Sequence, residues 1–449
     1  MSRGSLKLIL AIAVLPGRGS GTTGIANDCR ADGSSVAAAR LGADLAYDPL
    51  TKAAPTAVKH QSPQATTLNL WYVGLAVFAI TVATHVRVPL LADMGRELGM
   101  GPAALGAYVA FFAMGRIVAD VPAGRLTDSR PVRSMLAVGA VFASVGGLVA
   151  GIAPIALVAF AGSFVIGVGS AWTNTTGISA FAEAPRERRG VAMSGFAAAL
   201  LVGQAIGPTL GGVAASLWDW RVALLAGAAL AGVVAVILVW PRKAGTTIPT
   251  ARPRDTNGAT VAPLVLVAIY LLPAVQFAIG AALIQTLVPI VGDGELGLTV
   301  GTIGAAIGVA GLLRLSAALV TGRISDNISR RWALFPGLVL QVASLITFAV
   351  FDSLAAWWVA IVLSALGSSA VNVGATVLAD LSEGGPLGRR LGMFRLSGDV
   401  ALFLAPLVTG VLYQVSGRGI ALVPLIIFVL FVTALNWMVV PETLPRATG

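Results

Sequence analysis

The sequence repeats itself at a fixed offset, and this repeat limits the folds that the chain can adopt. The segment Gly124-Arg-Leu-Thr-Asp128 recurs as Gly322-Arg-Ile-Ser-Asp326, 198 positions further along. The same offset relates more pairs on both sides: Arg116 and Arg314, Arg133 and Arg331, Asn174 and Asn372, Pro208 and Pro406, and Gly212 and Gly410. Solenoid repeats have periods of about 20 to 50 residues. A repeat of this greater length, in a strongly hydrophobic chain, predicts two fused halves of a membrane protein.

The composition supports a membrane protein and argues against a nucleic-acid-binding protein. Hydrophobic residues make up 57% and charged residues 11% of the chain, whereas soluble chains average about 25% charged residues. The net charge is +10, but the arginines stand in short clusters between apolar stretches, which is typical of cytoplasmic loops. The cysteine and histidine content, Cys29, His60 and His85, argues against disulfides and metal sites. We expect no cofactor, no metal and no nucleic-acid partner.

Twelve segments are long and apolar enough to cross a bilayer as helices, which takes about 20 residues each. They are residues 70–92, 102–123, 134–152, 155–180, 191–215 and 220–240, and then 262–290, 300–321, 332–351, 354–379, 391–414 and 419–440. These runs are apolar all round, whereas the strands of a membrane β-barrel alternate apolar and polar residues. The sequence therefore predicts an all-α membrane protein with 12 transmembrane helices in two pseudo-symmetric six-helix bundles.

Basic residues divide unevenly between the two sets of connecting loops. If the first span enters from the cytoplasm, the inner loops hold fifteen Arg and Lys residues and the outer loops hold three, which are Arg96, Arg221 and Arg418. Cytoplasmic loops are enriched in Arg and Lys. We therefore expect a multi-pass protein of the plasma or inner membrane with both termini in the cytoplasm.

Shifts in composition divide the chain into five parts. Residues 1–66 form a tail, residues 67–240 and 261–441 form the two bundles, residues 241–260 form a linker, and residues 442–449 form a second tail. The linker is polar, basic and rich in Pro and Gly, as in flexible connections. The run Leu6–Leu15 resembles a signal peptide, but a cleaved signal would place the N-terminus outside. We expect a disordered cytoplasmic tail, or a translation start assigned too far upstream.

A charged loop motif occurs at the same place in each half. In the first copy Gly124 is expected to allow a tight helix exit, and Asp128 can accept hydrogen bonds from backbone N–H groups or arginine. The basic cluster is expected to hold the loop at the inner lipid surface. The first copy keeps Gly124, Leu126, Asp128, Arg133 and Leu136, and the second keeps Gly322, Asp326, Arg330, Arg331 and Leu334. Both strings resemble the loop motif of the major facilitator superfamily, and this resemblance covers residues 68–441.

The fifth span carries a glycine-rich string that refines the resemblance. It reads Gly203-x-x-x-Gly207-Pro208-x-x-Gly211-Gly212. Glycines at four-residue spacing lie on one helix face and allow close helix packing, and Pro208 can kink the span. The string is similar at every fixed position to the antiporter motif of the superfamily, which implies export, especially of drugs in exchange for protons. For any one of these glycines, plain packing remains the alternative.

One position departs from the pattern of proton-coupled exporters. Many members of the resembled branch carry an arginine in the middle of span four, four residues before a Gly-x-Gly string. Here the string is Gly167-Val-Gly169, and the arginine position is Ser163. Proton coupling, if present, must therefore use another group.

Four charges within the spans are candidates for a gate or a coupling site, because ionisable groups in a membrane are costly. Arg116 and Asp120 lie four residues apart in span two, and Arg395 and Asp399 lie four apart in span eleven. In the resembled fold these spans are antiparallel neighbours. Asp120 and Arg395 then lie about 6 Å from the cytoplasmic end, and Arg116 and Asp399 about 12 Å. We expect a cross-helix cluster that holds the cytoplasmic side closed, and the alternative is two pairs within each helix.

Other polar residues of the spans are candidates for a central cavity. Arg314 is a candidate for an anionic substrate group, a carbonyl, or the carboxylates Glu183 and Asp380. The cavity candidates are Trp172, Asn174, Gln204, Gln276, Asn372 and His85. For the asparagines the alternative is an interhelical hydrogen bond, worth about 1 kcal/mol or less in a membrane. For His85, which could titrate, it is an ordinary hydrogen-bonding role.

These features predict a monomeric transporter, not an enzyme, that works by alternating access. We expect export of a small amphipathic or hydrophobic compound in exchange for protons, with the bilayer, the compound and protons as its partners. Uptake of a small metabolite by proton symport is the alternative within the same fold. A membrane receptor or enzyme is a distant alternative, because the chain has no P-loop, no Gly-x-Ser-x-Gly string and no metal-ligand cluster.

Overall fold

The computed structural model describes residues 63–127, 129–184, 188–240, 261–382 and 387–442. These residues form helices joined by turns, without a strand. The predicted linker, the second tail apart from Glu442, and nearly all of the first tail lie outside the described residues.

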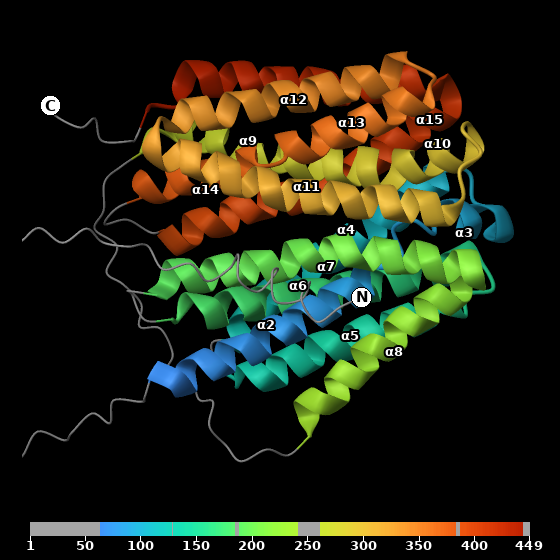
Figure 1. Ribbon diagram of the computed structural model, residues 1–449, viewed down its shortest axis with the longest axis horizontal. Coiled ribbons are helices and arrows are strands. Elements are labelled where there is room, and N and C mark those ends of the chain that lie inside the picture. Colours follow the sequence, from blue (N-terminus) through green and yellow to red (C-terminus); the bar gives the residue numbers. More distant parts are fainter. Residues whose placement is uncertain (1–62, 128, 185–187, 241–260, 383–386, 443–449) are drawn as a thin grey trace, which may run out of the picture. The chain divides into compact units, whose positions relative to one another are not determined.

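The first half contains six long helices and one short one, which Figure 1 shows on one side of the helical region. They are α2 (Pro63–His85), α3 (Leu91–Leu98), α4 (Pro102–Thr127), α5 (Val132–Gly151), α6 (Ala156–Ala182), α7 (Arg189–Leu217) and α8 (Trp220–Val239). Large apolar side chains such as Trp71, Leu157 and Val239 are about 70% exposed. Such outward-facing apolar residues suit a lipid environment, because lipid and not water covers them.

The second half repeats this arrangement on the other side of the interface (Figure 1). It contains α9 (Pro263–Ile279), the π-helix η2 (Gly280–Leu287), α10 (Val288–Gly294), α11 (Val300–Asn327), α12 (Arg330–Val350), α13 (Leu354–Gly367), α14 (Ala370–Asp380) and α15 (Leu387–Val439). Its largest buried core joins apolar residues of α9, η2, α11, α12, α13 and the last part of α15.

The described helices account for the predicted spans. Ten of them are long and apolar enough to cross a membrane, and the shorter apolar helix Leu70–His85 adds one more. One of the ten, Arg390–Val439, leaves helical geometry at Gly417, where φ is 77°, so it comprises spans eleven and twelve. Glycine tolerates this left-handed φ because it has no Cβ. Span ten is divided into α13 and α14 at Ser368 and Ser369.

Three boundaries differ from the sequence-based expectation. The first span ends at His85 and not near residue 92, because Pro89 interrupts helical hydrogen bonding and α3 starts separately at Leu91. Gly124 does not form a helix exit: α4 continues to Thr127, where the Thr127 hydroxyl bonds Ala123 O at 2.7 Å. Span seven includes the π-helix η2, in which Thr286 Oγ1 donates to Ala281 O at 2.8 Å.

We name the two ends of the helical region by their loops. The loop-motif end carries the turns after Thr127 and Asn327, and the opposite end carries α3 and Gly417. α4 packs against α15, and α7 against α11, so these two pairs join the halves.

Both joining pairs contain close backbone contacts at equivalent positions of the repeat. A Cβ atom on Gly106 would lie 2.2 Å from Pro406 O, and one on Gly304 would lie 2.5 Å from Pro208 O. Two further glycines behave alike, since a Cβ on Gly410 would lie 2.7 Å from Pro102 O and one on Gly212 would lie 2.7 Å from Val300 O. These contacts lie toward the opposite end. By contrast, Gly190, Gly322 and Gly392, near the loop-motif end, have no described atom within 4 Å of a Cβ position. The halves therefore pack most closely at the opposite end.

Candidate functional site

Four charged side chains from α4 and α15 meet in the interior between the halves. Arg116 Nε donates to Asp399 Oδ1 at 2.8 Å, and the Asp399 side chain is fully buried. A second nitrogen of Arg116 donates to Ser170 Oγ at 3.2 Å. Three helices, α4, α6 and α15, thus hold one guanidinium group.

Arg395 lies beside both carboxylates of this cluster. Its Nη2 is 3.5 Å from Asp120 Oδ1, and its Nε is 3.9 Å from Asp399 Oδ2. Thr175 Oγ1 donates to Asp120 Oδ1 at 3.2 Å. The structure thus brings together the four predicted gate residues, and the contacts between α4 and α15 are shorter than the 3.9 Å contact within α15.

Arg87 is a buried charge that the sequence reading missed, although it lies within the predicted span 70–92. Its side chain is 1% exposed. Its Nη2 donates to Gln285 Oε1 at 3.1 Å, so it connects the turn after α2 with η2 of the second half. Its Nε has no hydrogen-bond partner among the described residues. The guanidinium carbon lies 4.0 Å from the ring centre of Phe112, which fits a cation–π contact.

Arg314 and His85 are two further polar residues of the spans. Arg314 forms no ion pair within the described part of the chain, and its Nε is buried without a partner there. His85 Nδ1 is 2.9 Å from Thr81 O and 3.2 Å from Thr84 Oγ1. The hydrogen-bonding contacts of His85 therefore lie within the last turns of α2.

The other predicted cavity residues have different surroundings. Gln276 Oε1 accepts a hydrogen bond from Gln341 Nε2 at 3.0 Å, within the second half. Trp172 is buried, with its ring 5.9 Å from that of Phe142 and its Nε1 without a described partner. Asn174 and Gln204 are half-buried and Asn372 is exposed. A role for these residues in lining a cavity stays a prediction.

The glycine string of α7 packs this helix against the end of α2. Cβ atoms on Gly203, Gly207 and Gly211 would lie 2.8 Å from Thr81 Cβ, 2.7 Å from Val82 O and 2.2 Å from Val86 O, respectively. Gly212 instead contacts α11. The string therefore fixes the backbone next to Arg87, because the side chain of any larger residue at Gly211 would collide with the carbonyl oxygen of Val86.

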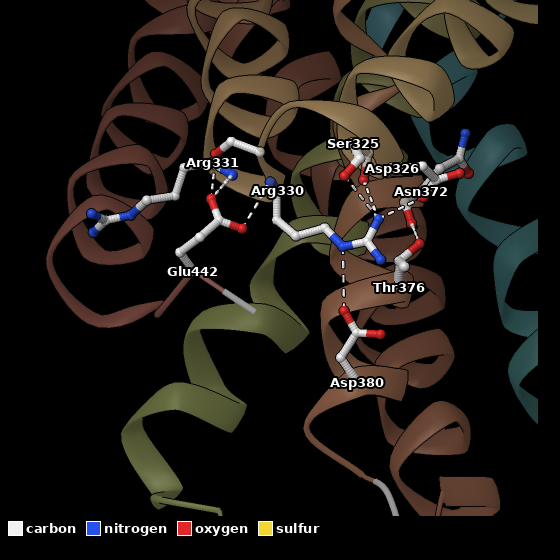
Figure 2. A network of polar contacts seen from close by, with 9 residues as sticks. Ser325, Asp326, Arg330, Arg331, Asn372, Thr376, Asp380 and Glu442 are labelled. Atoms are coloured by element: carbon white, nitrogen blue, oxygen red, sulfur yellow. Dashed lines mark hydrogen bonds and ion pairs between the residues drawn. The ribbon is translucent and has the colours of Figure 1, made fainter. Parts of the chain in front are cut away.

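The second loop motif forms a polar network at the loop-motif end (Figure 2). Arg330 binds Asp326 Oδ1 at 2.7 Å, Ser325 Oγ at 2.8 Å and Asp380 Oδ2 at 3.3 Å. The backbone nitrogen of Arg331 donates to Glu442 Oε2 at 3.3 Å. The network connects α11, α12, α14 and the residues after α15 (Figure 2). It is therefore a structural link within the second half.

The first loop motif is described only in part. Asp128 lies outside the described residues. Arg133 donates to the backbone oxygens of Ile237 and Trp240, which ties the start of α5 to the end of α8. Arg133 and Arg331 thus have equivalent roles, since Arg331 donates to Trp437 O in the last part of α15.

Ion pairs at the opposite end connect α3 with both halves. Arg96 Nη1 lies 2.5 Å from Asp293 Oδ2 of α10, and Arg96 also binds Asp93. Glu97 accepts hydrogen bonds from Arg221 at 2.7 Å and from Trp220 Nε1 at 2.5 Å. These bonds lower the pKa of the Glu97 carboxyl group below its usual value.

Comparison with solved structures identifies the fold. A bacterial homologue of the human lysosomal transporter Spinster, in an inward-facing and occupied conformation, has a TM-score of 0.70 at 15% identity, covering 84% of this chain and 97% of that one. A D-xylose–proton symporter has a TM-score of 0.68 at 15% identity, covering 84% and 98%.

Comparison with known sequences identifies the family. The multidrug resistance protein Stp of Mycobacterium tuberculosis (strain CDC 1551 / Oshkosh) is 28% identical over 158 residues, and the match spans 34% of this chain and 29% of Stp. The match thus spans less than a third of the length of that relative. The family model described as Major Facilitator Superfamily matches residues 73–313 and 274–449. With its two pseudo-symmetric bundles of apolar helices, the chain belongs to the Major Facilitator Superfamily of membrane transporters.

Proposed function

We propose that this transporter exports a small amphipathic or hydrophobic compound in exchange for protons. The observation that carries the proposal is the cluster of Arg116, Asp120, Arg395 and Asp399 between α4 and α15, in which Arg116 and Asp399 are buried. Arg395 lies near both carboxylates of the cluster, so protonation of either carboxylate would weaken its attraction to the arginines. A proton that enters this cluster would change its contacts across the halves.

The cluster also suits a gate. Removing one partner of a buried ion pair costs about 3–5 kcal/mol, because a charge is then left without compensation. Separation of α4 from α15 at this depth therefore needs a change that offsets the free energy lost with the ion pair. Protonation of a carboxylate, or binding of the compound, would supply it. Because Ser163 replaces the arginine of related exporters, this cluster takes the coupling role in our proposal.

Two observations support export as the direction. The glycine string of α7 is complete, and it packs α7 against both α2 and α11 at the opposite end. The partial match to Stp, which is named a multidrug resistance protein, agrees with a drug-like substrate. We further propose that the protein lies in the plasma or inner membrane with the loop-motif end and both termini in the cytoplasm. The excess of Arg and Lys in the loops at that end supports this orientation. We propose a monomer.

Flux in membrane vesicles tests the exchange of compound for protons. The purified protein is reconstituted, a pH gradient is imposed, and proton movement is recorded against a panel of compounds. We expect compound and proton flux in opposite directions. Asp120→Asn and Asp399→Asn should abolish both, whereas Asp352→Asn, at an exposed aspartate of the opposite end, should preserve both. Compound accumulation without proton movement would overturn antiport, and flux of both in the same direction would show symport.

A charge swap tests the gate. Asp120→Arg and Arg395→Asp each place two like charges together, so each single variant should lose transport. The double variant restores opposite charges across α4 and α15 and should recover transport. A double variant that is no more active than either single variant would show that the pair does not act across the interface.

A further inference from the structure

A groove of about 520 Å³ lies between α5 and α8, two helices of the first half that pack side by side (Figure 1). Arg133 and Ser134, at the start of α5, form the polar end of the groove. Most of its wall is apolar and includes Ala137, Val141 and Val239, and the two valines are exposed. Ligand sites have volumes of about 300–1,000 Å³. The groove therefore has the size of a ligand site and opens to the apolar surface of the spans.

Arg133 is a cation in this groove without a described counter-charge. Its Nη2 donates to Ile237 O at 3.3 Å and to Trp240 O, so it binds the carbonyl groups at the end of α8. Both acceptors are neutral, and Arg133 forms no ion pair with any carboxylate that the structure describes. Its Nε is buried and has no partner among the described residues. The guanidinium group therefore has capacity to donate to an anion in the groove.

In the second half, aromatic side chains occupy the equivalent place between α12 and the last part of α15. The rings of Phe335 and Trp437 have their centres 4.6 Å apart, and the guanidinium carbon of Arg331 lies 5.2 Å from the centre of the Trp437 ring. Arg331 therefore has a cation–π partner. In the first half the aromatic positions hold smaller residues, which leaves the groove open. The 198-residue repeat relates Arg331, Phe335 and Trp437 to Arg133, Ala137 and Val239, respectively.

We propose that this groove binds one anionic phospholipid from the leaflet at the loop-motif end. The lipid phosphate lies beside Arg133, and one acyl chain lies along Ala137, Val141 and Val239. Basic pockets between transmembrane helices bind anionic headgroups. An anionic lipid matches the whole groove, because a free phosphate would leave the apolar wall without a partner and a neutral hydrocarbon would leave Arg133 without an anion.

The polar end of the groove has the residues expected at the depth of lipid headgroups. Trp240, at the end of α8, is exposed, and tryptophan is enriched where the membrane meets water. Arg130, in the turn before α5, is exposed as well, and arginines at the membrane surface attract anionic lipids. Lipid binding in this groove depends neither on the compound that is transported nor on the direction of transport.

Photocrosslinking of the purified full chain in micelles tests the site. The reagent is phosphatidylglycerol with a diazirine in the middle of one acyl chain, and mass spectrometry of peptides locates the adducts. We expect adducts in α5 and at the end of α8 that unlabelled phosphatidylglycerol suppresses. Phosphatidylcholine with the same acyl chains presents a headgroup without net charge, and inorganic phosphate presents an anion without chains. Both should suppress these adducts at least tenfold less effectively.

Variants assign the labelling to the groove. Ala137→Phe combined with Val239→Trp gives the first half the aromatic residues of the second and leaves Arg133 bound to the end of α8. This double variant should reduce the adducts in α5 and α8 at least tenfold. Arg133→Gln should reduce them to a similar extent, and Arg133→Lys should retain part of them. Arg125→Gln, at an exposed arginine of the loop-motif end, should be labelled like the wild type.

The unfolding temperature in micelles gives a second measurement, because a ligand of the folded state stabilises that state. Phosphatidylglycerol should raise this temperature more than phosphatidylcholine does, and the difference should vanish in the double variant. Any of three results would overturn the proposal: no adducts in α5 and α8, adducts that phosphatidylcholine or inorganic phosphate suppresses as well as phosphatidylglycerol does, or adducts that survive in the double variant. Suppression by phosphatidylcholine would show a general lipid-facing surface, and suppression by phosphate would show a site for a free anion.

Discussion

At the scale of single residues, Asp399 forms the buried ion pair that connects α15 with α4. Its carboxylate is fully buried and lies between Arg116 at 2.8 Å and Arg395 at 3.9 Å. Arg116 in turn has one further described hydrogen bond, to Ser170. Loss of the negative charge would therefore leave the buried Arg116 without its ion-pair partner, at a depth where water cannot replace the carboxylate.

We expect Asp399→Asn to destabilise the protein by about 3–5 kcal/mol, the usual cost of breaking a buried ion pair. The free energy of unfolding in mixed micelles measures this change. Asp352→Asn is the matched control, because Asp352 is 82% exposed, and exposed pairs contribute about 0–1 kcal/mol. Equal stabilities of the two variants would show that Asp399 does not hold Arg116 as an ion pair.

Glu97 gives a prediction for pH dependence outside the membrane spans. Hydrogen bonds from Arg221 and Trp220 lower its pKa in the folded protein below the usual value of 4.5. A depressed folded pKa means that the ionised form stabilises the fold above about pH 4.5 and that this contribution is lost as the pH falls further. Thermal unfolding between pH 3 and pH 6 should therefore show a smaller loss on acidification in Glu97→Gln than in the wild type. Arg221→Gln should behave like Glu97→Gln, and an unchanged pH profile in both variants would contradict this account.

The charged residues show what the sequence could predict at this scale and what it could not. The resemblance to the superfamily implies that spans two and eleven are antiparallel neighbours. Helix rise then pairs Arg116 with Asp399 and Asp120 with Arg395, because depth in a membrane depends on position along the span. Arg87 could not be given a neighbour in this way. It lies in a turn between α2 and α3, and its partner Gln285 is in a π-helix, so neither position follows from a regular helical rise.

At the scale of helices, close glycine contacts at the opposite end bring the halves together. Gly106, Gly304, Gly212 and Gly410 meet backbone atoms of the facing helix, and the two pairs of contacts are related by the 198-residue repeat. Small residues allow such approach of helices in membranes, where packing and not the hydrophobic effect drives association. The antiporter-type string extends this packing from α11 to α2.

Gly304→Ala should separate α7 from α11, because the new Cβ atom would lie 2.5 Å from Pro208 O. Overpacking of this kind costs about 1–3 kcal/mol, which unfolding in mixed micelles can measure. Gly322→Ala lies in the same helix with open space at its Cβ position. There the change should be neutral or stabilising by up to about 1 kcal/mol, from helix propensity alone. The reverse order of the two stabilities would refute close packing at Gly304.

The spans themselves were predictable from length and apolar composition. The predicted ends of the first two spans were wrong, at a proline and at a glycine. The turn after His85 replaces the last part of the predicted first span because of Pro89, and α4 continues through Gly124 because its φ stays helical. Gly417 ends the first part of α15 as expected of a turn between spans eleven and twelve. The π-helix η2 has no sequence signature of its own, since its apolar pattern is that of any buried helix.

At the scale of the whole molecule, the contacts between the halves are not alike at the two ends. The opposite end has the glycine contacts, the Arg96–Asp293 pair and the Arg87–Gln285 bond. Toward the loop-motif end the connection is the cluster around Asp399. Alternating access requires that these two sets of contacts open in turn, so the charged cluster should close tightly when the opposite end separates.

Distances between spin labels at the two ends test this reciprocal motion most directly. In a Cys29→Ser background, Ala92→Cys with Gly294→Cys reports on the opposite end, and Ser129→Cys with Asn327→Cys reports on the loop-motif end. The account predicts two distance populations for each pair when pH and compound are varied, and as one pair lengthens the other must shorten. A single distance for both pairs under all conditions, or lengthening of both pairs together, would contradict alternating access between the two halves.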